Sequence, residues 1–159
     1  LGSGTILRES IAAADLLKKD FGVTADIWSV TSFNELRRDG LSAHRWNMLH
    51  PEEKPKQSYV EECLVDSKGP VIAATDYMKS YADQVREFVP RTYNVLGTDG
   101  FGRSDTRARL RNFFEVDRHY IAVAALSALV QDNVIESSVV SKAIKQYGID
   151  PDKSDPAAL

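Results

Sequence analysis

The fold class of this chain is decided by one stretch of its sequence, Tyr93-Asn94-Val95-Leu96-Gly97-Thr98-Asp99-Gly100-Phe101-Gly102-Arg103-Ser104. The first four residues have the composition of a β-strand, and the next eight form a glycine-rich loop. Residues 105–114 then have the composition of a helix. The stretch therefore predicts a strand, a turn and a helix in succession, which is the repeating step of α/β proteins.

Residues 97–104 allow two interpretations. Their glycine spacing is one residue short of a phosphate-binding loop, with Arg103 where the lysine should stand. A freestanding nucleotide-binding α/β protein is one hypothesis. Against it, Asp99 would place a carboxylate in the phosphate cradle, and the broad fork of arginine does not fill the space of a lysine tip. We favour the second interpretation, a turn in which glycines adopt positive φ and Ser104 or Asp105 caps the next helix.

The same alternation of helices and strands extends to both sides of this stretch. Capping boxes at Ser32-Phe33-Asn34-Glu35 and at Ser58-Tyr59-Val60-Glu61 each predict the start of a helix. The hydrophobic periodicity predicts strands at residues 25–30, 70–74 and 93–96. It predicts helices at residues 6–19, from 32, 58–65, 78–88, 105–114, 118–130 and 137–147.

Strands separated by helices predict an α/β fold with a mostly parallel sheet and helices on both of its faces. The opening residues Leu1-Gly2-Ser3-Gly4 lack an initiator methionine and resemble the end of a strand that turns into a helix. We therefore expect a fourth, truncated strand that lies mostly before Leu1, and a chain that is a piece of a longer one. Residues 1–148 are predicted to form the domain, and residues 149–159 an irregular tail.

Composition excludes several classes of function. The 159 residues carry 20 Lys plus Arg against 23 Asp plus Glu, a net charge of −3, so no basic field favours nucleic acid. The single cysteine, Cys63, cannot form an intramolecular disulfide and suits a reducing cytoplasm. The longest apolar run, residues 120–130, is far shorter than the ~20 residues of a membrane span. We expect a soluble cytoplasmic protein without membrane or nucleic-acid partners.

Two features are candidate interaction surfaces. Arg103, Arg107 and Arg111 are spaced by four residues and should project from one side of a helix. They could bind a carboxylate-rich partner surface, or they could form a solvated face with local ion pairs to Asp99, Asp105 or Glu115. Trp46 belongs to a segment of large side chains, residues 46–51, in what should be a connection, and an exposed segment of this kind would be a binding patch.

No residue is predicted to be catalytic. Gly2-Ser3-Gly4 could begin a dinucleotide fingerprint, but Leu7 occupies the third glycine position. His44 and His50 are six residues apart and do not share a helical face as a metal pair would. His119 has no acid or nucleophile in a recognisable pattern around it, and Cys63 is most simply a small buried hydrophobe.

Four segments, in order, carry a resemblance to a known family. They are residues 30–33 (Val-Thr-Ser-Phe), 45–51 (Arg-Trp-Asn-Met-Leu-His-Pro), 75–79 (Thr-Asp-Tyr-Met-Lys) and 96–105 (Leu-Gly-Thr-Asp-Gly-Phe-Gly-Arg-Ser-Asp). Together they closely resemble the C-terminal domain of the homodimeric bacterial pyruvate dehydrogenase decarboxylases, which belong to the transketolase-like enzymes. The resemblance implies a three-layer sandwich with a mostly parallel sheet.

The resemblance also implies a function for the parent enzyme. Such enzymes decarboxylate pyruvate on thiamine diphosphate with magnesium and pass the acetyl unit to a lipoyl group of the dihydrolipoyl acetyltransferase. The cofactor-binding signature of the family, Gly-Asp-Gly followed by paired asparagines, is absent from this chain. We therefore assign no catalytic, cofactor-binding or metal-binding residue. The resemblance implies a scaffold domain that packs against a homodimer partner and is inactive in isolation.

Overall fold

The run Val71-Ile72-Ala73-Ala74 forms a strand that is covered on both faces, as a run of apolar residues in a parallel sheet requires. In the computed structural model, which describes residues 1–158, this strand (β3, Val71–Ala74) pairs with β4 (Tyr93–Leu96) in register from Val71 opposite Tyr93 to Ala74 opposite Leu96. On its other side lies β1 (Gly2–Ser3), which also pairs with β2 (Ser29–Val30). The order β2-β1-β3-β4, with every pairing parallel, confirms the predicted fold class.

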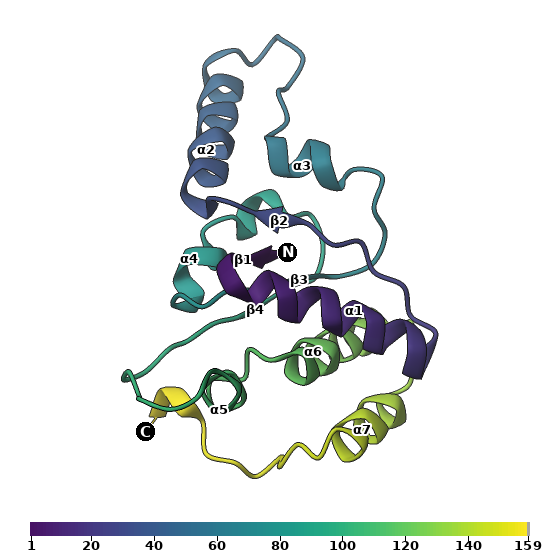
Figure 1. Ribbon diagram of the computed structural model, residues 1–159. Helices are drawn as coiled ribbons and strands as arrows, with labels where there is room; N and C mark the ends of the chain where they lie inside the picture. The colour runs from purple at the N-terminus through teal and green to yellow at the C-terminus, as the bar shows by residue number, and fades with distance from the viewer. Residues whose placement is uncertain (159) are drawn as a thin grey trace.

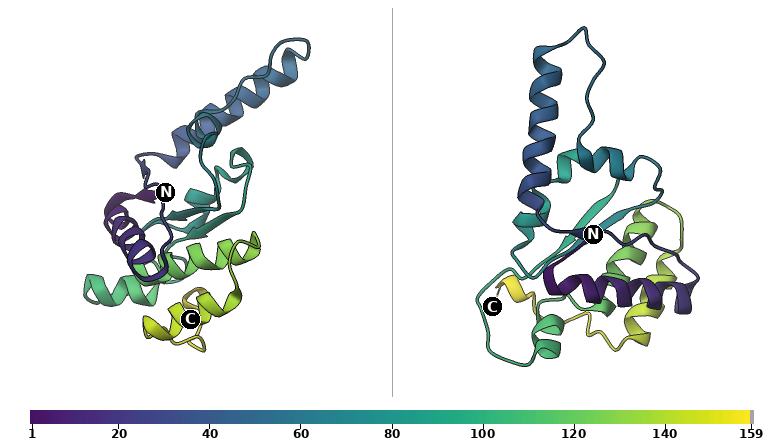
Figure 2. Two further views of the ribbon diagram at one scale, coloured as in Figure 1. Left: turned by 90° about the vertical axis from the view of Figure 1, so that its right-hand side faces the viewer. Right: turned by 45° about the horizontal axis from the view of Figure 1, so that its top comes forward.

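Helices cover both faces of the sheet, as Figures 1 and 2 show. The core on one face is built around Phe88 with residues of α2 (Phe33–Leu49), α3 (Tyr59–Leu64) and α4 (Lys79–Asp83). The core on the other face is built by α1 (Leu7–Phe21), α6 (Arg118–Gln131) and α7 (Ser137–Gln146). Alternate residues of β3 enter the two cores, which gives the three layers that the resemblance implied.

The sequence signals for helix ends mostly act as predicted. The Ser58 side chain accepts from the backbone of Glu61, whose carboxylate accepts from the backbone of Ser58, so this capping box is complete. Ser32 likewise accepts from the Glu35 backbone at 3.2 Å, but the Glu35 carboxylate pairs with Arg38 instead of reaching back. The first predicted capping box is therefore half formed.

The predicted helix over residues 78–88 is wrong as a continuous element. It divides into α4 and a short 3-10 turn, η2 (Arg86–Phe88). In a continuous helix the carbonyl of Ala82 would accept from the backbone N–H of Arg86. Here the buried hydroxyl of Tyr93 donates to that carbonyl at 2.7 Å, and the Arg86 guanidinium donates to the carbonyl of Tyr93. A contact with β4 thus takes the place of the helical hydrogen bond.

Two ends of the chain differ from their predictions in detail. The fourth strand is visible as Gly2–Ser3 and lies in the interior of the sheet, followed by the 3-10 turn η1 (Gly4–Ile6); its continuation before Leu1 stays a prediction. Near the other end, a 3-10 turn η3 (Pro156–Ala158) interrupts the expected irregular tail and buries Pro156. Lys153 also donates to the carbonyls of Asn112 and Phe113, so the tail lies against the helix α5 (Arg107–Phe113). No helix within residues 1–158 combines the length and apolar character needed to span a membrane.

Candidate functional site

The glycine-rich loop is fastened to the segment that follows β3. The Asp99 carboxylate accepts from the backbone N–H of Lys79 at 2.9 Å, and the Thr98 N–H donates to the carbonyl of Tyr77 at 2.9 Å. Gly97 packs so closely that a Cβ there would stand 2.8 Å from the Tyr77 oxygen. The close packing and these hydrogen bonds are all contacts within the chain itself. The nucleotide-binding interpretation of residues 97–104 is therefore not supported.

The helix after this loop begins later than predicted. Thr106, rather than Ser104 or Asp105, is the N-cap of α5, because its hydroxyl accepts from the backbone N–H of Arg109 at 3.4 Å. Asp105 instead accepts from the backbone N–H of Thr106 at 2.7 Å. Arg103 therefore lies in the loop, outside the helix that was expected to carry it.

The three predicted arginines nevertheless gather around one cavity. Arg103 folds back, and its guanidinium carbon lies 4.2 Å from the centre of the Phe113 ring. Arg107 is exposed in the first turn of α5, and Arg111 is half-buried near its end. All three side chains line a cavity of about 320 Å³ beside the carboxyl ends of the strands.

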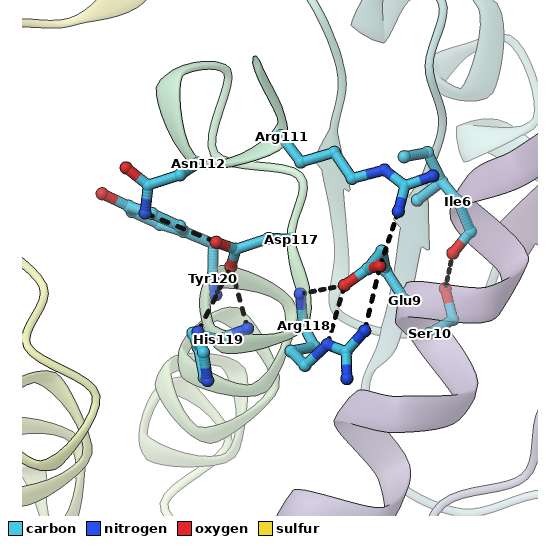
Figure 3. A network of polar contacts seen from close by, with 9 residues as sticks. All are labelled: Ile6, Glu9, Ser10, Arg111, Asn112, Asp117, Arg118, His119 and Tyr120. Carbon is cyan, nitrogen blue, oxygen red and sulfur yellow. Dashed lines mark hydrogen bonds and ion pairs between the residues drawn. The ribbon is translucent and has the colours of Figure 1, made fainter. Parts of the chain in front are cut away.

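Arg111 joins a buried ion-pair network that Figure 3 shows. Its guanidinium donates to Oε1 of Glu9 at 2.7 Å, and the guanidinium and backbone N–H of Arg118 donate to Oε2 at 2.9 and 3.1 Å. Glu9 is only 4% exposed and comes from α1. The network therefore joins α1 to the junction between α5 and α6.

The predicted local ion pairs of the arginine stripe are wrong. Among residues 1–158, Asp105 pairs with Arg109 at 3.9 Å and Glu115 pairs with Lys153 at 3.3 Å, while Asp99 holds the glycine loop. The one stripe residue that forms an ion pair, Arg111, does so with a carboxylate 102 positions away in the chain.

The arginines of this network stabilise the ionised form of the Glu9 carboxylate. Hydrogen bonding from Arg118 lowers the pKa of Glu9, against the effect of burial, and the pKa of Arg118 is raised by Glu9. Asp117 positions Arg118 by capping α6, because its carboxylate accepts from the backbone N–H groups of His119 and Tyr120. The network therefore keeps the Glu9 carboxylate ionised although this residue has little solvent exposure of its own.

Sequence reasoning missed Glu9, although a signal was present. Glu9 follows the buried Ile6 by three residues and precedes the buried Ala13 by four. These are the spacings that put residues on one face of a helix, so Glu9 lies on the apolar face of α1. A carboxylate on such a face requires a positive partner, which indicates an ion pair with a distant arginine or lysine.

Trp46 has a different environment from the one predicted. α2 continues through Leu49, so Trp46 lies in a helix and not in a connection. Its ring stacks on His50 with centroids 4.4 Å apart, and the Lys56 ammonium lies 4.3 Å from its centre. Asn47 adds two hydrogen bonds to the backbone of Lys56, so Trp46 helps hold the returning loop against the end of α2.

The exposed apolar surface of this region lies beside Trp46. Met48 and Leu49 are 71% and 51% exposed at the end of α2, which projects away from the sheet in both views of Figure 2. The arginine cavity lies elsewhere, between α5, the turn η1 and the residues that follow β3 and β4; Figure 1 shows α5 on the other side of the sheet from the end of α2. The structure thus brings the three arginines together but leaves Trp46 apart from them.

The comparison with protein families decides the classification. Residues 1–117 match the family model of the transketolase-like TK C-terminal domain. The chain belongs to this family. The matched residues include the whole parallel sheet, Glu9 and the three arginines of the cavity, whereas α6 and α7 follow the matched segment.

Known relatives of this transketolase-like domain are much longer than the chain. It is 67% identical to the pyruvate dehydrogenase E1 component of Pseudomonas aeruginosa over 157 residues, which are 98% of this chain and 18% of the relative. It is 57% identical over 159 residues to that of Cupriavidus necator, covering 100% of this chain and 18% of the relative. It is 54% identical over 157 residues to that of Escherichia coli, again covering 98% and 18%. The chain thus spans about 18% of the length of these relatives.

Proposed function

We propose that this domain is the C-terminal part of a pyruvate dehydrogenase E1 component and serves as its scaffold and dimerisation domain. The observation that carries the proposal is 67% identity to such an enzyme over 98% of the chain. Packing supports a structural role, because the carboxylate of Glu9 and both arginines that neutralise it join α1 to α5 and α6. The reducing cytoplasm suits the single free thiol of Cys63.

The parent enzyme would decarboxylate pyruvate with thiamine diphosphate and magnesium, the cofactor acting as the electron sink for the carbanion. The closest match to the cofactor-binding signature of the family is Asp99-Gly100, and both residues already contact other parts of the chain. Asp99 accepts from the backbone N–H of Lys79, and a Cβ on Gly100 would stand 2.6 Å from the carbonyl oxygen of Pro156. The residues do not fit the cofactor, so no step of the reaction is assigned to this domain.

The proposed partners are a second copy of the parent chain and the dihydrolipoyl acetyltransferase component. The projecting end of α2 suits the contact between copies, because Met48 and Leu49 are exposed while Trp46, His50 and Lys56 hold the loop beside them in shape. Arg103 and Arg107 beside the cavity are charged and exposed, so they suit a more polar contact.

A chimera tests the proposal. The matching segment of the Pseudomonas aeruginosa relative is replaced by this chain, and dimerisation and pyruvate decarboxylation are measured by light scattering and by a spectrophotometric assay. We expect a dimer with activity close to that of the parent, and loss of both when the segment is deleted. A folded chimera that neither dimerises nor decarboxylates pyruvate would contradict the proposal.

Variants of the chimera identify the surface involved. Met48→Asp should weaken the dimer at least tenfold, because it places a charge in an apolar contact. Val134→Asp is the matched control, since Val134 is 62% exposed against 71% for Met48 but lies after α6, away from the end of α2. Equal dimer strength in the two variants would exclude the end of α2 from the interface.

A further inference from the structure

The cavity lined by the arginines lies at the switch point of the sheet. The strand order β2-β1-β3-β4 places β2 on one side of β1 and β3 on the other, so the connection that leaves β1 and the connection that leaves β3 run in opposite directions along the sheet. In open α/β sheets the crevice outside the carboxyl ends of the strands at such a point is the common place for ligands. Thr5 follows β1, Asp76 follows β3 and Thr98 follows β4, and all three line the cavity.

The charges in the cavity favour an anion. Arg103, Arg107 and Arg111 line it together with one carboxylate residue, Asp76, and since Glu9 already pairs with Arg111, the unpaired positive charge is that of Arg103 and Arg107. Arg111 uses Nη1 to bind Glu9, and among residues 1–158 neither Arg103 nor Arg107 forms an ion pair or side-chain hydrogen bond with the protein. Guanidinium groups recognise phosphate and carboxylate through paired N–H donors.

Contacts within the protein set the positions of Arg103 and Arg111, and they use one guanidinium donor of Arg111 and none of Arg103. Arg103 lies over the face of Phe113, which leaves the edges of its guanidinium group directed to other acceptors. Arg111 is held from behind by the buried Glu9 and is therefore fixed before any ligand arrives. Arginines that are already ordered lose less entropy when they bind.

Other residues that line the cavity can form hydrogen bonds with hydroxyl groups of a ligand. The carboxylate of Asp76 accepts a long hydrogen bond from Thr5 at 3.4 Å, and the backbone carbonyl of Asp76 accepts from Thr98 at 2.8 Å. Asp76 is exposed and keeps acceptor capacity, while a ligand that was anionic throughout would be repelled by it. The preferred ligand therefore has an anionic end and a hydroxylated end.

We propose that this cavity binds a small hydroxylated phosphate or carboxylate, with its anionic group between the three arginines and its hydroxyl groups at Asp76. A volume of about 320 Å³ suits a molecule of this size. This site differs from the phosphate-binding loop that was considered for residues 97–104. Its donors are the side chains of Arg103 at the end of the loop and of the arginines of α5, whereas the backbone of the loop is hydrogen-bonded to the segment after β3.

Calorimetric titration of the chain tests the proposal with glycerol 3-phosphate, inorganic phosphate and glycerol as probes. We expect glycerol 3-phosphate to bind with a submillimolar Kd, inorganic phosphate about tenfold more weakly and glycerol not at all. Arg107→Ala should weaken binding of glycerol 3-phosphate at least tenfold, since Arg107 makes no contact that the fold needs. Asp76→Asn should reduce the preference for glycerol 3-phosphate over inorganic phosphate.

Arg109→Ala is the matched control. Arg109 lies on the same helix and is 79% exposed, but it does not line the cavity. Binding unchanged within twofold in this variant supports the site, whereas equal weakening by Arg107→Ala and Arg109→Ala would show a general charge effect and overturn it. Absence of binding at 10 mM glycerol 3-phosphate, about ten times the highest Kd expected for this probe, would also overturn it. The same titration of the full-length chimera gives the decisive result if the isolated chain does not fold, and its activity reports separately on the proposed function.

Discussion

Arg111 donates to Oε1 of Glu9 at 2.7 Å across 102 positions of the chain, and the Glu9 carboxylate that receives this bond is also held by Arg118. One acidic residue on the buried face of α1 thus orders an arginine at the end of α5 and another at the start of α6. The contact ties the domain together and positions one wall of the arginine cavity.

Glu9→Gln should lower the free energy of unfolding by about 2 kcal/mol, because it leaves two arginines beside a neutral group. The loss falls below the usual range for a buried pair, since the Arg118 side chain is 46% exposed. Urea unfolding measures it. Asp15→Asn, an exposed position on the same helix, should change stability by under ~0.5 kcal/mol, and an equal effect of the two substitutions would contradict the role of Glu9.

Gly40→Ala should destabilise the domain by about 2 kcal/mol, although alanine normally favours a helix. A Cβ at Gly40 would stand 2.4 Å from the ring of Phe88, which is fully buried and cannot move away. Thermal unfolding measures the change. Ser42→Ala, exposed on the same helix, should instead be neutral or stabilise by a few tenths of a kcal/mol; unaltered stability of Gly40→Ala would mean that α2 does not cross Phe88 so closely.

Gly100→Ala should release the C-terminal turn and cost about 1–3 kcal/mol. Gly100 has φ of +97°, and a Cβ there would stand 2.6 Å from the carbonyl oxygen of Pro156. Limited proteolysis should then cut near residues 149–158 faster than in the original chain. Gly102→Ala is the control, because no atom lies within 4 Å of its Cβ position; equal cleavage of the two variants would argue against the contact.

The stability of a chain that begins at Leu1 should rise between pH 6 and pH 8. Burial lowers the pKa of the Leu1 amino group from 8.0 to about 6, so in this interval the unfolded chain binds more protons than the folded one. The gain should approach 2–3 kcal/mol, about 1.4 kcal/mol for each pH unit of the shift. Urea unfolding at pH 5.5, 7 and 8.5 measures it.

Acetylation of the Leu1 amino group separates this effect from that of the other titrating groups. The acetylated chain keeps every side chain but loses the titrating amine, so its stability should change less between pH 6 and pH 8. Parallel pH profiles for the free and acetylated chains would show that the amino group near Ile72 is not buried as the structure has it.

Local patterns were enough to predict the fold class and most of the elements. The capping serines and the apolar run at residues 71–74 act through neighbours within a few positions, so their signals are present in the sequence itself. The prediction failed at residues 78–88, where Tyr93 takes the carbonyl that a continuous helix would have used. That competition depends on a strand from another part of the chain.

The sequence by itself determined a parallel α/β domain of the transketolase-like family and singled out the three arginines as one candidate surface. Only the tertiary structure decided that Arg111 binds Glu9, that Trp46 supports a loop, and that the arginines surround a cavity at the switch point. The physical reason is the distance along the chain over which each kind of interaction acts. Hydrogen-bonding and periodicity signals act along one element, whereas ion pairs and cavities arise where elements distant in the chain pack together.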